Sequence, residues 1–219
     1  MREDEIHSAM NVLRQATNPL KKQRAVTDRT SERDPFRILI SAMLSLHIRD
    51  AVLAEEASER LLALADTPQA LVCLPVPRIR EAISPIDSSR PRAHHILETC
   101  KFLVERYDGR VPDSRTELMA LPGIGPKTAS FIVIQAYQKP AICVDMHVHR
   151  ITNRWGYVST KSPEKTETVL RAKLPRDYWL ELGEELTALG DHYCFPQLPN
   201  CLTCPVKAYC DRVGVMRSQ

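Results

Sequence analysis

The 219-residue sequence contains no long hydrophobic run, because no stretch approaches the ~18 consecutive apolar residues that a membrane-spanning helix requires. Glycine is scarce, at 7 residues, and no segment alternates polar and apolar residues as a half-buried strand does. The first ten residues, MREDEIHSAM, are charged and lack the apolar core of a signal peptide. These absences argue against membrane, secreted and β-rich classes, and they predict a cytoplasmic, all-α protein with no membrane partner.

The sequence also lacks a large excess of positive or negative charge, because its net charge is only +3. Such a small basic excess permits a nucleic-acid partner without favouring one. Helical periodicity is present along most of the chain. It predicts an amphipathic helix over residues 3–15, a basic linker over 21–24, and longer helices over 36–46, 50–64 and 92–107. Further helices are expected to begin at Ser114, Pro126, Asp145, Pro163 and Asp177. The pattern predicts about ten helices joined by short loops, and it does not indicate a function.

The segment LPGIGPKTAS at residues 121–130 predicts two helices joined by a tight turn. Gly123 and Gly125 flank Ile124, and Pro126 is suited to open the second helix. Free backbone amides at a helix start bind anions, and a nucleic-acid phosphate is the natural occupant. Pro126 has no amide, so one potential donor is missing. A simple helix–helix turn is the alternative, although the whole string resembles the helix-hairpin-helix element of DNA repair glycosylases.

Two residues near this turn carry a possible chemistry. Lys127 lies at the positive end of the predicted helix dipole, which disfavours its charged form, and a neutral lysine amine can form a Schiff base. An exposed lysine that binds phosphate is the alternative. Asp145 fits the N-cap of the helix that begins in VDMHVHR, but beside Lys127 it can accept a proton or stabilise positive charge on a sugar ring. His147 and His149 point to different helix faces, which favours packing over a metal site.

Four of the seven cysteines are spaced C-x6-C-x2-C-x5-C: Cys194, Cys201, Cys204 and Cys210. Four thiolates can hold zinc or an iron–sulfur cluster. Structural zinc sites usually carry two close cysteine pairs and this segment has only one, so the spacing favours the iron–sulfur cluster. The remaining cysteines lie in apolar stretches and are predicted to be buried small hydrophobic residues: Cys73, Cys100 and Cys143.

Taken in order, LPGIGPKTAS, VDMHVHR and the four-cysteine spacing closely resemble the endonuclease III family of DNA glycosylases, and the similarity runs over residues 33–213. The resemblance implies a two-lobed, all-α helix-hairpin-helix glycosylase fold with DNA bound in the cleft between the lobes. One lobe, residues 27–140, would be a six-helix barrel that ends in the hairpin. The other, residues 1–26 and 141–219, would carry a 4Fe–4S cluster, with the four cysteines of loop 194–210 as its ligands.

The resemblance also implies a reaction on double-stranded DNA that contains a damaged base or an abasic site. Damaged, mainly oxidised, pyrimidines would be flipped out of the duplex and excised, and the abasic site would be nicked by β-elimination. Lys127 would attack the anomeric carbon, and Asp145 would assist it. DNA contacts are assigned to the hairpin and to two further positions: Gly123, Ile124, Gly125, Thr128, His47 and Arg90.

Three segments depart from the usual family pattern. His47 stands where a polar residue, often Gln, fills the gap left by the flipped base, and Asp87-Ser88 stands where an apolar residue wedges between base pairs. Loop 195–200 lacks the basic residues that relatives often place there. A non-catalytic or catalytically weak DNA-binding module, a mismatch-type thymine or uracil glycosylase, and a zinc-stapled interaction protein therefore stay open. We expect a monomer, associated with the nucleoid if the source is prokaryotic.

Overall fold

A computed structural model describes residues 1–24, 34–45, 51–86 and 89–219 of the chain. The described residues form helices, turns and loops and include no strand, which confirms the all-α prediction. The chain divides into two compact units, one of residues Met1–Val26 and Pro140–Gln219 and the other of residues Thr27–Lys139. Within the described ranges, no helix combines the length and the apolar character that crossing a membrane requires.

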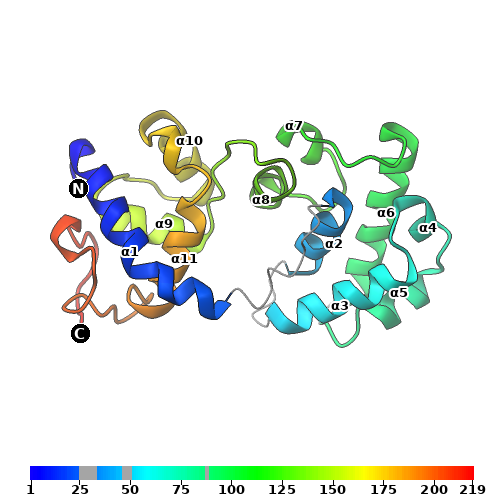
Figure 1. The fold of residues 1–219 in the computed structure, drawn as a ribbon, viewed down its shortest axis with the longest axis horizontal. Helices are drawn as coiled ribbons and strands as arrows, with labels where there is room; N and C mark the ends of the chain where they lie inside the picture. The colour runs from blue at the N-terminus through cyan, green and yellow to red at the C-terminus, as the bar shows by residue number, and fades with distance from the viewer. Residues whose placement is uncertain (25–33, 46–50, 87–88) are drawn as a thin grey trace. The chain divides into compact units, whose positions relative to one another are not determined.

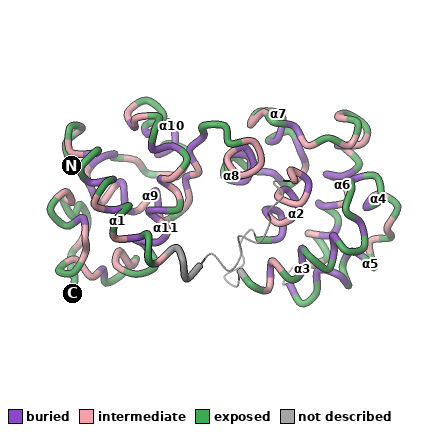
Figure 2. The backbone as a smooth tube through the Cα atoms, viewed as in Figure 1, coloured by how far each residue is buried: buried purple, intermediate pink, exposed green. Residues whose placement is uncertain are grey.

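The unit of residues 27–139 is built around the long helix α6 (Figure 1). Helix α6 packs against α2, α4 and α5, while α2 also packs against α3 and α8, and the short α7 packs against α8. The bounds of these helices are α2 Pro35–Ser45, α3 Ala51–Leu64, α4 Pro68–Val72, α5 Val76–Ala82, α6 Ser89–Tyr107, α7 Arg115–Leu118 and α8 Pro126–Tyr137. The buried faces of these helices form the core of this unit (Figure 2).

Local capping chemistry sets several helix ends in this unit. The amide of Phe36 donates to Asp34 Oδ1 at 2.9 Å, so α2 begins at the Asp-Pro step, as predicted. Helix α6 begins at Ser89 rather than at Arg92, because a proline such as Pro91 is tolerated in a first helical turn. It ends where Gly109 adopts a positive φ of 76° and its amide bonds to the carbonyl of Leu103 at 3.0 Å.

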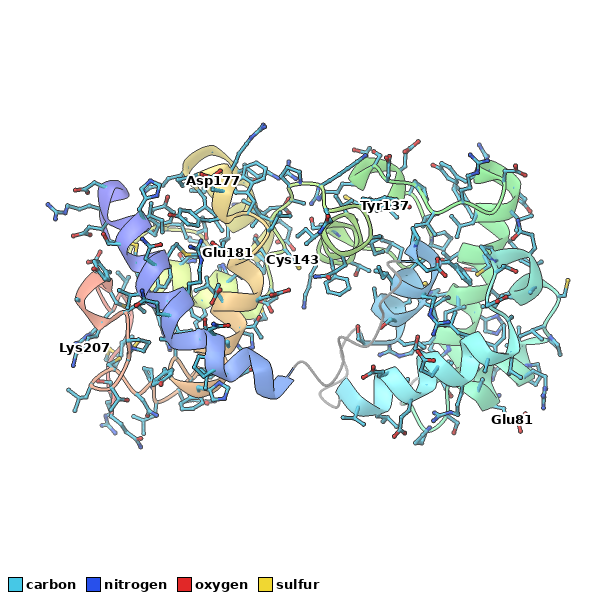
Figure 3. The ribbon with its side chains drawn as sticks, in the orientation of Figure 1. Glu81, Tyr137, Cys143, Asp177, Glu181 and Lys207 are labelled. Atoms are coloured by element: carbon cyan, nitrogen blue, oxygen red, sulfur yellow. The ribbon has the colours of Figure 1, made fainter. Side chains whose placement is uncertain are left out.

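The unit of residues 1–26 and 140–219 packs four helices around one apolar core: α1 Ile6–Arg24, α9 Met146–Arg154, α10 Pro163–Lys173 and α11 Leu182–His192. The described residues of this unit also form the 3₁₀ turns η1 Glu3–Glu5, η3 Arg176–Tyr178 and η4 Lys207–Tyr209. Ile6, Met10 and Leu13 form the buried stripe of α1, which confirms the predicted amphipathic face. Arg14 on the exposed side of α1 forms a salt bridge at 2.5 Å with Glu181, which Figure 3 labels.

Two sequence predictions in this unit are wrong. Residues 21–24, predicted as a basic linker, form the last turn of α1, because lysine, glutamine and arginine are good helix formers. The helix predicted to begin at Asp177 begins five residues later, at Leu182. In the segment before it, the side chains of Tyr178 and Trp179 are buried, and the indole N–H of Trp179 donates to the carbonyl of Leu174 at 3.0 Å.

Candidate active site and cluster pocket

The hairpin between α7 and α8 is packed from beneath by apolar side chains. The predicted apolar positions are all buried: Leu118, Leu121, Ile124, Ala129 and Ile132. Gly123 has a positive φ of 76°, a conformation that glycine adopts without strain, and the amide of Ile124 bonds to the carbonyl of Leu121 at 3.2 Å. From α6, Thr99 Oγ1 donates to the carbonyl of Pro122 at 2.7 Å. The turn is therefore held in shape both by its sequence neighbours and by a distant helix.

The outer side of this turn is open. Gly125 is the N-cap of α8, no side chain caps the helix, and Pro126 occupies its first position, as predicted. Gly123 and Gly125 are exposed, and a Cβ placed on Gly125 would meet nothing within 4 Å. A helix N-terminus that lacks a side-chain cap and is open to solvent can receive an anion such as a phosphate.

The hairpin residues assigned to DNA binding differ in what they can offer. Lys127 is exposed in the first turn of α8, so its amine is accessible. Ile124 and Thr128 are only 6% and 3% exposed, so their side chains help to pack the hairpin and are not open to a ligand. Arg90 is exposed in the first turn of α6. His47, with the wedge residues Asp87 and Ser88, lies outside the described residues.

Asp145 is the N-cap of α9, as its position predicts. Its Oδ1 atom accepts hydrogen bonds from the amides of His147 and Val148, both at 2.9 Å. The two histidines of this helix make separate hydrogen-bonding contacts. Nδ1 of His147 lies 3.3 Å from Arg150 Nη2, and Nδ1 of His149 lies 2.6 Å from Thr166 Oγ1. The half-buried carboxylate is thus oriented by the helix that it caps.

All four clustered cysteines line one pocket that opens to solvent. None of the four forms a disulfide, and Arg154, Lys207 and Arg212 line the same pocket; Figure 3 labels Lys207. Burial raises the pKa of the Cys204 thiol to about 11, and the neighbouring cysteines add to this shift. In the part of the chain that the structure describes, no three His, Cys, Asp or Glu side chains are arranged to hold a single metal ion.

The pocket has the chemistry that an iron–sulfur cluster needs. Cysteine thiolates are its usual ligands, and cations around the pocket offset the negative charge of a thiolate-bound cluster. Arg154 Nη1 also donates to Cys194 Sγ at 3.3 Å. Asn200, in the same lining, has a buried Oδ1 atom for which the described residues provide no hydrogen-bond donor. The residues present therefore fit the group that the family resemblance implies.

Two arginines that sequence reasoning missed tie α9 to the start of the cluster loop. Arg150 donates twice to the carbonyl of Cys194, at 3.1 and 2.9 Å, and burial lowers its pKa. Arg154 donates to the carbonyls of Phe195 and Pro196 at 2.7 and 2.6 Å. The available signal was their four-residue spacing, which places both side chains on one face of the helix.

The other cysteines follow the prediction only in part. Cys100 is buried, as predicted, and burial raises its pKa to about 12. Cys143, labelled in Figure 3, is half-buried. The prediction is wrong for Cys73, which is exposed because it ends the short helix α4 on the solvent side.

A family model described as HhH-GPD superfamily base excision DNA repair protein matches residues 40–176. The chain belongs to this superfamily. It is 43% identical over 180 residues to Endonuclease III of Thermotoga maritima, covering 82% of this chain and 84% of that protein. It is 33% identical over 177 residues to Endonuclease III of Escherichia coli, covering 81% and 83% of the two chains.

Comparison with solved structures agrees with the sequence relatives. A structure of a non-covalent Endonuclease III–DNA complex matches with a TM-score of 0.81 and 28% identity, over 97% of this chain and 96% of that chain. A thermostable thymine-DNA glycosylase matches with a TM-score of 0.73 and 25% identity, over 83% and 85%. The resemblance to the endonuclease III family is therefore confirmed, and the chain is a DNA glycosylase/AP lyase of base excision repair.

Proposed function

We propose that this HhH-GPD protein excises damaged, mainly oxidised, pyrimidines from duplex DNA, with Lys127 as the nucleophile and Asp145 as its assisting carboxylate. The observation that carries the proposal is the hairpin itself. An exposed lysine follows directly on a turn whose outer side is open, in a chain of the base excision repair superfamily. A phosphate bound at the turn would fix the DNA backbone beside the amine that attacks the sugar.

The proposed chemistry begins with the lone pair of Lys127 Nζ, which attacks C1′ of the extruded nucleotide. The bond from C1′ to the base breaks, and the base leaves with the bonding electrons and takes up a proton. Asp145 stabilises the positive charge on the sugar ring or takes the proton that Lys127 loses. Ring opening gives a Schiff base on Lys127, loss of a C2′ proton then expels the 3′ phosphate, and water hydrolyses the Schiff base.

We further propose that the pocket of Cys194, Cys201, Cys204 and Cys210 holds a 4Fe–4S cluster. Four iron–thiolate bonds would cross-link distant parts of loop 194–210, which has little regular secondary structure. Helix α9 positions the start of this loop, because Arg150 and Arg154 donate hydrogen bonds to the backbone carbonyls of its first residues. Loop 195–200 carries no basic residue, so its part is to shape the cluster pocket rather than to bind DNA.

A second substrate class is favoured by one observation. The structural likeness to a thermostable thymine-DNA glycosylase makes a thymine or uracil opposite guanine the alternative target. The two classes differ in the base that is removed, whereas the lysine-dependent lyase step belongs to the first.

An excision screen over defined duplexes tests the proposal. The panel contains oxidised pyrimidines, uracil and thymine opposite guanine, an oxidised purine and undamaged DNA, and Lys127→Ala is the control. We expect excision of oxidised pyrimidines with strand nicking, and neither with Lys127→Ala. Preferential removal of thymine or uracil without nicking would favour the second class. Equal excision by Lys127→Ala would overturn the role of the lysine.

A further inference from the structure

His95 of α6 lies against the phosphate-binding turn. Its Cβ, Cγ and Nδ1 atoms are 3.4, 3.4 and 3.5 Å from the position that a Cβ on Gly123 would occupy. The His95 side chain therefore occupies the space next to the turn into which a side chain at position 123, the residue with the positive φ, would project. His95 is also exposed, so its side chain is accessible to a ligand.

The position of His95 is fixed by its neighbours on α6. Arg92 and Thr99 lie three residues before it and four residues after it, so all three side chains share one helix face. Arg92 Nη1 donates to the carbonyls of Met43 and Leu44 at 3.1 and 3.4 Å, which ties α6 to the end of α2. Thr99 holds the carbonyl of Pro122. This face of α6 therefore supports the hairpin, and His95 is its exposed member beside the turn.

The turn lacks one of the backbone donors that a helix start usually offers to an anion. Pro126 occupies the first position of α8 and has no amide hydrogen, so the helix start offers one donor fewer than usual. An imidazole N–H is a hydrogen-bond donor in either tautomer. The ring of His95 stands on the Gly123 side of the turn, while the Gly125 side is open. A phosphate oxygen received by the turn would thus find a side-chain donor next to the backbone donors.

We propose that His95 is an additional DNA-contact residue, which donates a hydrogen bond to the phosphate held by the hairpin. The inference rests on the proposed function, since it requires a DNA phosphate at this turn. The contact is to the backbone of DNA and carries no sequence information, so it strengthens binding equally for all lesions and flanking sequences.

Three variants of the full-length protein test the proposal: His95→Ala, His95→Gln and His94→Ala. His94 is the matched control, because it is also exposed but lies about 100° around the helix from its neighbour. Affinity is measured by fluorescence anisotropy on duplexes with a tetrahydrofuran abasic-site analogue, which cannot form a Schiff base. Thermal unfolding of each variant checks that it is folded at the assay temperature.

We expect His95→Ala to weaken binding about fivefold on every duplex, the size of one ordinary, solvent-exposed hydrogen bond. His95→Gln keeps a donor and should restore most of the affinity, and His94→Ala should bind like the wild type. A change below twofold for His95→Ala, an equal loss for His94→Ala, or no recovery with His95→Gln would each overturn the proposal. The last result would mean that the ring matters by packing on Gly123.

Borohydride trapping of the wild type on an abasic duplex separates this proposal from the proposed function. Trapping together with unchanged affinity of the His95 variants would reject only the role of His95. A wild type that is not trapped would reject the lysine chemistry, whatever the His95 variants do.

Discussion

The Oδ1 atom of Asp145 accepts hydrogen bonds from the amides of His147 and Val148 at 2.9 Å, so the residue proposed to assist catalysis is also the N-cap of α9. The two roles make different demands on the side chain. Capping requires an acceptor oxygen, whereas assistance to Lys127 requires a negative charge or a proton acceptor. A substitution that keeps the oxygen and removes the charge separates them.

Asp145→Asn is that substitution. We expect base excision to slow by about 10²–10⁴-fold, because the carboxylate charge is lost, while the melting temperature changes little, since asparagine caps as well as aspartate. Single-turnover excision, DNA affinity and thermal unfolding measure the three effects. Asp145→Ala is the comparison, and it should also lose about 1 kcal/mol of stability with the cap. A large loss of affinity in Asp145→Asn would show that the residue is structural.

The two glycines of the hairpin are expected to behave differently. Gly125 has a φ of −89° and open space where a side chain would project, so Gly125→Ala should cost only the N-cap preference of glycine over alanine, less than ~1 kcal/mol, and should weaken DNA binding by obstructing the phosphate. Gly123→Ala should instead destabilise the fold by about 1–2 kcal/mol, because its φ of 76° is strained for alanine. Thermal unfolding and anisotropy on the same preparations distinguish the two. Unchanged affinity of Gly125→Ala would argue against a phosphate at this turn.

The cysteine pocket predicts the metal content of the native protein. We expect a brown protein with about four iron atoms and four acid-labile sulfides per chain. Cys204→Ser should lower both, because Cys204 lines the pocket, whereas Cys73→Ser should leave both unchanged, because Cys73 is exposed on α4. Elemental analysis and the visible absorption spectrum provide the readout. Stoichiometric zinc in place of iron would contradict the cluster assignment.

The sequence predicts the hairpin well because its determinants are local. Leu118, Leu121 and Ile124 lie within seven residues, and the two glycines and Pro126 set the turn by their own backbone preferences. The cap at Asp145 is predicted for the same reason, since both of its partners follow within three residues.

Contacts between distant segments are not predictable in this way. Arg154 and Cys194 are 40 residues apart, and only the packing of α9 on α11 brings their side chains together. The position of His95 next to Gly123 likewise depends on how α6 packs in the fold. Cys73 is predicted to be buried from its apolar sequence neighbours, but it is exposed, because neighbours in sequence do not determine which side of a helix end faces solvent.

Borohydride trapping on duplex DNA with a natural abasic site tests the central claim most directly, because only an enzyme amine that has formed a Schiff base is reduced to a stable covalent complex. The wild type should form a complex of the mass of protein plus DNA, and peptide mapping should locate the link at Lys127. Lys127→Ala, folded and still bound to DNA, should form none. Trapping at another residue, or equal trapping by Lys127→Ala, would contradict the account.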